Sequence, residues 1–255
     1  MQVNCDLFRA GAAQFLPYFK GAPLVQSSGT GKTRMVLQLG RIAPLIICAG
    51  YPSADRQFRG FLDLTDLKVR KVNIQERVAI FITAWFFILA KDLQTIDLDN
   101  KSNYLKPLDH YSSDDIVQRR KLFFERVLAK AKDMISDRAS PESNKIFEQH
   151  LVEPVLNLSQ EMCQLQGYCC CSDDRIPPVF VANDECAELP SPALFCLRRL
   201  WNYVRDLEIE QPCKISCLWL VLLSTNSGAA SLVSQDPQVE ASLRHVIAAP
   251  LPMFV

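Results

Sequence analysis

The feature that most constrains this chain is a Gly-rich stretch near its N-terminus, Val25-Gln26-Ser27-Ser28-Gly29-Thr30-Gly31-Lys32-Thr33. It fits the phosphate-binding pattern G-x-x-x-x-G-K-[ST] at Gly31, Lys32 and Thr33. In that pattern backbone N–H groups wrap a phosphate, the lysine reaches the β- and γ-phosphates, and the hydroxyl binds Mg²⁺. Gln26 stands where the leading glycine belongs, which removes one residue that adopts positive φ without strain. The sequence therefore predicts a phosphate-binding P-loop with one departure from the pattern.

The residues on either side of this stretch supply the context that the motif requires. Residues 23–25 are apolar, as in a short strand, and residues 33–39 are compatible with a helix that ends at Gly40. A helix that starts here would point its free N–H groups and its positive dipole end at an anion. The alternative is a polar surface loop that happens to precede a lysine. The predicted nucleotide contacts are Ser27, Ser28, Gly29, Thr30, Gly31, Lys32, Thr33 and Arg34, with Thr33 also a ligand of Mg²⁺.

The charge balance gives no support to a nucleic-acid partner. Lys+Arg and Asp+Glu number 28 each, so the chain has no net field that would attract a polyanion or an anionic membrane surface. The most apolar run, residues 78–90, has thirteen residues, whereas a membrane-spanning helix needs about 20. We therefore expect a buried helix there, no membrane association and no nucleic-acid binding.

The ten cysteines are interpreted as thiols of an intracellular protein, cytoplasmic or nuclear, because the N-terminus lacks the basic and apolar pattern of a signal peptide. The densest group is Cys163 with Cys169, Cys170 and Cys171. Zinc sites usually show paired C-x₂₋₄-C spacing, so ordinary thiols are favoured over a metal site here.

Four apolar runs predict strands of a parallel sheet. The first is at residues 23–25, and the second, residues 44–49, is uninterrupted, as in a strand buried on both faces. Two more follow at residues 178–183 and 215–223, with a helix predicted between them at residues 191–206. Strand, helix and strand in this order form βαβ units, which imply parallel pairing.

Residues 53–168 are predicted to be mostly helical. Ser112 and Asp115 form a capping-box pair that opens a long helix. Its apolar residues lie along one side: Ile116, Phe123, Phe124, Val127, Leu128, Ala131 and Ile135. Its basic residues fall largely off that side, which is typical of a solvated face. Another helical stretch begins near Pro141 and is interrupted or kinked at Pro154.

Two polar strand ends complete the predicted site. Asp184 and Glu185 follow the third strand, where a Walker B motif would hold Mg²⁺ through Asp184 and act on the attacking water through Glu185. Asn183 departs from that motif because it interrupts the apolar run, and an exposed acidic turn is the alternative. Asn226 follows the fourth strand, where a polar sensor residue would touch the γ-phosphate or the water; an ordinary loop is equally compatible with the sequence.

These three motifs in this order resemble the additional-strand class of P-loop ATPases, which includes AAA+ and STAND-type proteins. The segments Q-S-S-G-T-G-K-T-R, G-Y-P, the N-D-E strand end and L-L-S-T-N also resemble uncharacterised fungal proteins, some grouped with Crinkler-type effectors. The resemblance spans residues 20–230 and implies a central sheet in which the P-loop strand lies beside the Walker B and sensor strands.

The predicted fold class is therefore α/β, a parallel-sheet P-loop NTPase core with a large, mostly helical insertion. We expect one domain over residues 1–255, with its core at residues 20–52 and 175–255 and its insertion at about 53–170. A C-terminal lid is not evident, and the chain is compatible with a fragment. The leading hypothesis is binding of ATP with Mg²⁺ and hydrolysis that drives a conformational change on an unknown protein partner. The alternatives are a nucleotide-binding signalling module without turnover and a small-molecule or nucleotide kinase, for which Arg119, Arg120 and Arg126 are candidate lid arginines.

Overall fold

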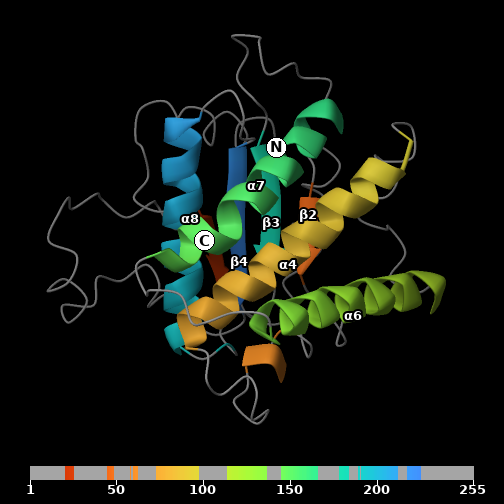
Figure 1. Ribbon diagram of the computed structural model, residues 1–255, viewed down its shortest axis with the longest axis horizontal. Helices are drawn as coiled ribbons and strands as arrows, with labels where there is room; N and C mark the ends of the chain where they lie inside the picture. The colour runs from red at the N-terminus through yellow and green to blue at the C-terminus, as the bar shows by residue number, and fades with distance from the viewer. Residues whose placement is uncertain are drawn as a thin grey trace, which may run out of the picture.

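The structure, a computed structural model, describes residues 21–25, 45–48, 58, 60–62, 73–97, 114–136, 145–165, 178–183, 189, 191–211 and 217–224. Four strands and four long helices lie within these ranges (Figure 1). In chain order they are β1 (Gly21–Val25), β2 (Leu45–Cys48), α4 (Ile74–Thr95), α6 (Asp114–Ser136), α7 (Ile146–Leu165), β3 (Pro178–Asn183), α8 (Ser191–Glu210) and β4 (Cys217–Ser224).

The strands form one small parallel sheet in the order β1-β4-β3-β2. Each strand lies where an uninterrupted apolar run predicted it, because such runs are stable as strands when both faces of a sheet are covered. Val179 and Val181 of β3 and alternate leucines of β4 join the helical core. The intervening residues, such as Phe180 and Trp219, are buried as well, on the opposite face. Strands β3 and β4 are thus buried on both faces of the sheet.

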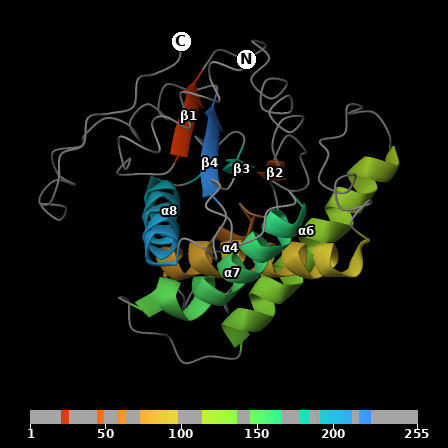
Figure 2. The same ribbon diagram turned by 90° about the horizontal axis from the view of Figure 1, so that it is seen from above.

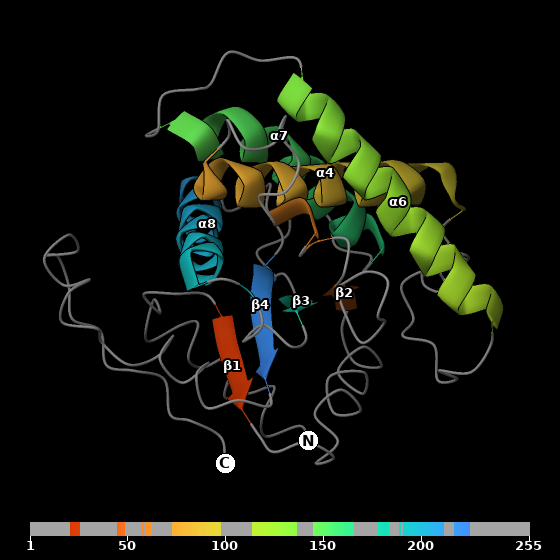
Figure 3. The ribbon, with the colours of Figure 1, turned by 90° about the horizontal axis from the view of Figure 1, so that it is seen from below.

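The predicted fold class, a parallel-sheet P-loop NTPase core with a helical insertion, is wrong. The described part of the chain is mostly helical: α4, α6, α7 and α8 have 22, 23, 20 and 20 residues, whereas the strands have 5, 4, 6 and 8. There is no large parallel sheet at its centre. The helices lie together along one side of the small sheet (Figures 2 and 3) and share one hydrophobic core with it.

Helix α4 is the centre of the helical layer and packs against α6, α7 and α8. Its sequence is apolar around most of its circumference, and 14 of its 22 residues are buried. A helix of this kind needs neighbours on several sides, which explains why helices rather than strands dominate the fold. Asn73 caps it, because the Asn73 Oδ1 atom accepts a hydrogen bond from the backbone N–H of Glu76 at 2.8 Å.

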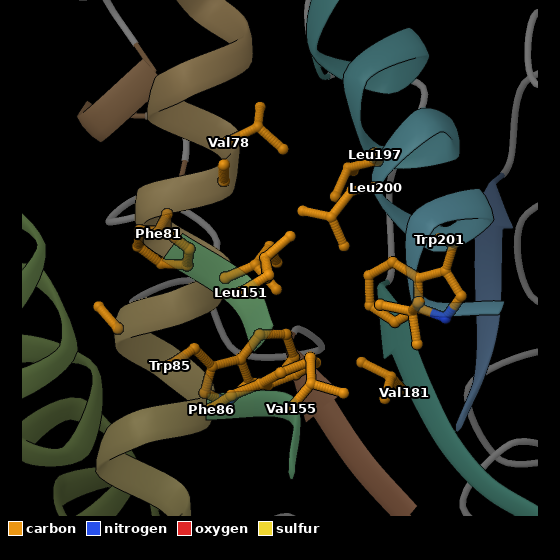
Figure 4. Packing of buried hydrophobic residues seen from close by; sticks show 14 of the residues in the cluster. Val78, Phe81, Trp85, Phe86, Leu151, Val155, Val181, Leu197, Leu200 and Trp201 are labelled. Atoms are coloured by element: carbon orange, nitrogen blue, oxygen red, sulfur yellow. The ribbon is translucent and has the colours of Figure 1, made fainter. Parts of the chain in front are cut away.

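Aromatic side chains fill the core around α4 (Figure 4). The ring of Phe81 lies 4.5 Å from that of Phe58, measured between centroids, and Phe86 meets Trp201 of α8 edge to face at 6.2 Å. Edge-to-face and offset aromatic pairs stabilise beyond the area that they bury. Trp201 therefore links α8 to α4 at the side of the sheet where Val181 lies (Figure 4).

The other helical predictions are borne out where the structure describes them, except for the interruption at Pro154. On α6, Phe124, Val127 and Ala131 are buried, while basic residues such as Lys121 are exposed. Helix α7 continues through Pro154 rather than ending there, and that proline is buried. The capping residue Ser112 and the helix predicted at residues 33–39 lie outside the described residues.

The predicted buried helix at residues 78–90 is confirmed and belongs to α4. By length and composition alone, α4 could cross a membrane, but 67% of its most apolar window is buried inside the protein. This burial is typical of a core helix, in agreement with the expectation drawn from its short apolar run.

Candidate functional site

The carboxyl ends of the four strands lie along one edge of the sheet, because all the strands are parallel. We call the four terminal residues, Val25, Cys48, Asn183 and Ser224, the carboxyl-terminal rim. Val25 pairs with Ser224, and Asn183 pairs with Cys48 on one side and with Leu222 on the other. Strands β1 and β4 therefore end level with each other, two residues beyond the end of β3. Ligands of open α/β sheets bind at such an edge.

Each of the three predicted motifs continues from a residue of this rim. The P-loop residues, Ser27, Ser28, Gly29, Thr30, Gly31, Lys32, Thr33 and Arg34, follow Val25; Asp184 and Glu185 follow Asn183; and Asn226 follows Ser224 by two positions. All of these predicted site residues lie outside the described residues. The structure thus brings together the strand ends that precede them, and the geometry of the motifs themselves stays a prediction.

The strand order differs in one respect from the arrangement that the resemblance implies. That arrangement has the P-loop strand beside both the Walker B strand and the sensor strand. In the structure β1 pairs with β4, and β4 separates it from β3. Neighbouring strands are about 4.8 Å apart, so β1 and β3 are about 10 Å apart, with the predicted sensor strand between them.

The donor set predicted for Mg²⁺ fits that ion chemically. Thr33 offers a hydroxyl and Asp184 a carboxylate, and Mg²⁺ prefers such hard oxygen ligands together with phosphate oxygens and water. The strands that lead to these two residues end at the same rim, separated by one strand. Among the residues that the structure describes, no group of three His, Cys, Asp or Glu side chains could hold a metal ion elsewhere.

Asn183 is the one polar side chain of the rim whose surroundings are described. Only 6% of it is exposed, and it follows Val179 and Val181 on the face of β3 that joins the helical core. The sequence pattern presents it as a departure from a Walker B strand. Asn183 is thus an interior residue at the end of β3, directly before Asp184 in the sequence.

Polar residues at the start of α4 form a second group that sequence reasoning missed. Glu76 is buried, its Oε2 atom has no hydrogen-bond partner among the described residues, and burial raises the pKa of its carboxyl group. Arg77 is fully buried, and its Nη1 donates to the carbonyl of Leu62 at 3.3 Å. The spacing Asn73-x-x-Glu76 is a capping-box signature that could have revealed this helix start.

Further polar contacts tie the helices to one another. Gln75 accepts a hydrogen bond from Nη1 of Arg199 at 3.1 Å, which joins α4 to α8. The Thr83 hydroxyl donates to the backbone carbonyl of His150 at 2.9 Å, which joins α4 to α7. These contacts hold the layer that covers one face of the sheet.

The lid arginines of the kinase alternative are not supported by the structure. Arg126 makes two hydrogen bonds to the carboxylate of Asp92, at 2.8 and 2.5 Å, and so fastens α6 to α4. Arg119 is exposed on the same helix, and the side chain of Arg120 lies outside the described residues. Helix α6 packs against α4 at the outside of the helical layer (Figure 3), rather than over the carboxyl-terminal rim.

Cys196, the described cysteine whose ionisation is perturbed, behaves as an ordinary buried thiol. Burial raises its pKa to about 11, although the positive charge of Arg199 opposes the shift. The thiol is therefore protonated at neutral pH and is a poor nucleophile or metal ligand. The cluster Cys169, Cys170 and Cys171 lies outside the described residues.

Comparison with known proteins adds no family to these observations. No family model matches the sequence, and neither a curated protein nor a solved structure is significantly similar to it.

Proposed function

We propose that this chain binds ATP together with Mg²⁺ at the carboxyl-terminal rim. The observation that carries the proposal is that three motifs far apart in sequence, at residues 26–33, 184–185 and 225–226, continue from strand ends at one edge of one sheet. Parallel pairing brings together only the ends of the strands that precede the three motifs. A chance match to the P-loop pattern would not be expected to follow a strand that ends at the same edge as the strands before an acidic pair and a polar pair.

Each predicted residue has a separate role in this proposal. The backbone N–H groups of residues 27–32 wrap the phosphates, the Lys32 ammonium neutralises the β- and γ-phosphates, and Arg34 adds positive charge beside them. Thr33 and Asp184 hold Mg²⁺, which neutralises phosphate charge when it is bound. Glu185 orients or deprotonates the attacking water, and Asn226 donates a hydrogen bond to the γ-phosphate or to that water.

The two departures from the motifs favour one alternative, a module that binds nucleotide without turnover. Gln26 replaces the leading glycine of the P-loop, and the buried Asn183 interrupts the apolar strand before Asp184. Binding depends mainly on the P-loop, whereas hydrolysis also requires Glu185 in place. An intracellular location, an unknown protein partner and the resemblance to additional-strand ATPases belong to the same proposal.

Replacement of Lys32 by alanine tests nucleotide binding. We expect Lys32→Ala to weaken ATP binding by at least about tenfold, because one charge-assisted contact to phosphate contributes about 1.5–3 kcal/mol. Lys91→Ala is the matched control, since Lys91 is an exposed lysine on α4. Binding is measured by calorimetric titration with ATP and MgCl₂. Equal affinity of the Lys32→Ala variant and the wild type would overturn the proposal.

The same titration followed by a phosphate-release assay separates hydrolysis from binding alone. Glu185→Gln should leave ATP affinity unchanged and abolish phosphate release if the chain is a hydrolase. Tight binding without release in the wild-type protein would support the module without turnover.

A further inference from the structure

Helix α6 is joined to the rest of the described structure mainly through α4. It lies across α4 at the outside of the helical layer (Figure 3), and α4 is the described element against which it packs extensively. Of its described side chains, only Phe124, Val127 and Ala131 are buried, and others such as Leu128 are half-buried. Separation of α6 from α4 would therefore expose a small part of the hydrophobic core and leave most of that core intact.

Helix α7 also packs on α4 but is held much more firmly. Of its 20 residues, 11 are buried, among them Leu151, Val155 and Leu158. Its backbone carbonyl at His150 accepts the hydrogen bond from the Thr83 hydroxyl, and α7 also contacts α8. The free energy of local opening rises with the apolar surface that the opening exposes. We therefore expect α6 to open more easily than α7.

Charged contacts add to the small apolar contact between α6 and α4. The guanidinium of Arg126 donates two hydrogen bonds to the carboxylate of Asp92, at 2.8 and 2.5 Å. The Lys130 ammonium lies 4.9 Å from the centroid of the Phe87 ring, within the range of a cation–π interaction. The Arg126 side chain is 52% exposed, so dissolved salt screens its attraction to Asp92. The strength of the α4–α6 contact should thus depend on ionic strength.

We propose that α6 is a salt-sensitive strap that separates from α4 as one unit while the rest of the helical layer stays folded. The ion pair with Asp92 and the cation–π contact with Phe87 determine how much of the protein is open. Opening parts the rings of Phe124 and Trp85, whose centroids are 5.9 Å apart in the closed arrangement. It exposes an apolar surface of α4 that includes Trp85, which is only 3% exposed when α6 is closed. The strap is separate from the proposed nucleotide site, because α6 does not lie over the carboxyl-terminal rim (Figure 3).

Hydrogen exchange, measured by mass spectrometry on overlapping peptides, tests whether α6 opens as a unit. Peptides from residues 121–133 of α6 should exchange at least about tenfold faster than peptides from residues 150–160 of α7. The peptides of α6 should share one rate, because a helix that opens as a unit exposes all of its amides together. Equal exchange of α6 and α7 would overturn the proposal, and so would a rate in α6 that decreases gradually from its ends to its middle.

The ion pair is tested by removing one of its charges. Asp92→Asn should accelerate exchange in α6 by about two- to fivefold and leave exchange in α7 unchanged, since a largely exposed ion pair makes a modest contribution. Asp206→Asn is the matched control, because the pair of Asp206 with Arg205 lies within α8, and it should leave α6 exchange unchanged. If Asp92→Asn does not fold, Arg126→Gln takes its place with the same expectations.

Ionic strength gives a readout that a purely structural role of the pair would not change. Raising NaCl from about 0.05 M to about 0.5 M should accelerate α6 exchange in the wild type by about twofold, and the effect should be smaller in Asp92→Asn. Wild-type exchange of α6 in Asp92→Asn would refute the charge control. Equal acceleration of α6 and α7 in that variant would show a global loss of stability and would refute the strap as well.

Discussion

Replacement of Phe81 by leucine should destabilise the protein mainly through lost ring contacts. Phe81 is fully buried in α4, and its ring lies 4.5 Å from that of Phe58 and 5.7 Å from that of Phe61. Leucine keeps most of the apolar volume but none of the aromatic pairing. Each aromatic pair contributes about 0.5–1.5 kcal/mol beyond burial, so the two contacts together predict a loss of about 1–3 kcal/mol. Alanine would cost about 3–5 kcal/mol, a large part of the stability of a typical domain.

Urea denaturation, followed by tryptophan fluorescence and by far-ultraviolet circular dichroism, measures the loss. We expect a lower midpoint with an unchanged m value, because the surface exposed on unfolding stays nearly the same. Phe87→Leu is the matched control, since Phe87 lies on the same helix but is only half-buried. The double variant Phe58→Leu/Phe81→Leu should show a coupling energy of about 0.5–1.5 kcal/mol.

Two results would refute this reasoning. The first is a loss in Phe81→Leu no larger than in Phe87→Leu. The second is additivity of the Phe58 and Phe81 substitutions within about 0.5 kcal/mol, which is the behaviour of residues that are not in contact. Either result would mean that Phe58 and Phe61 do not pack on α4 through these rings.

Two further predictions concern polar groups buried along α4. Because burial raises the folded-state pKa of Glu76 above its ordinary value of 4.5, its ionisation opposes folding; stability should fall as pH rises from about 4.5 through that raised pKa. Glu76→Gln should therefore be more stable than the wild type at pH 7, and the difference should vanish below pH 4.5. Urea denaturation at several pH values measures this difference. A Gln variant less stable than the wild type at pH 7 would contradict the raised pKa of Glu76. Thr83→Val removes the hydroxyl that donates to the His150 carbonyl without changing side-chain volume, and it should lower the free energy of unfolding by about 1–2 kcal/mol. Thr83→Ser should retain most of the stability. Equal stability of the Val and Ser variants would show that the hydrogen bond contributes nothing.

The strands were predictable from sequence because each is a short apolar run with no polar interruption until its end. The run predicted at residues 178–183 coincides with β3, and those near residues 23–25 and 44–49 correspond to β1 and β2. Their parallel pairing follows from the intervening helices. Their order in the sheet was not predictable in the same way, because apolar composition does not show which buried strand becomes the neighbour of another.

The balance between helix and sheet was the main error of the sequence-based expectation. The Gly-rich motif predicts a sheet core, with residues 53–170 as an insertion. Helix α4 contradicts this view because it is buried on most of its surface and shares its core with β3 and β4. An apolar run of thirteen residues predicts a buried helix, but it does not reveal how many helices must surround it.

The candidate site was only partly predictable. The motifs predict that residues 26–33, 184–185 and 225–226 act together, and the structure shows that the strands preceding them end at one rim. Arg77 and Thr83 escaped prediction because they lie beside or within an apolar run, and their hydrogen-bond partners come from the distant residues Leu62 and His150. Such long-range partners leave no local pattern in a sequence.

The pairing of β1 with β4 has a consequence for how the protein is made. The two strands lie at residues 21–25 and 217–224, and β4 is the strand with which β1 pairs in the described sheet. During synthesis β2 and β3 can pair once residue 183 has left the ribosome, whereas β1 must wait until residue 224 has followed. Contacts between such distant segments form slowly, and an unpaired strand edge is a template for aggregation. A chain that stops short of residue 224 would therefore leave β1 without this partner, and the first of the described strands to be synthesised would be among the last to become native.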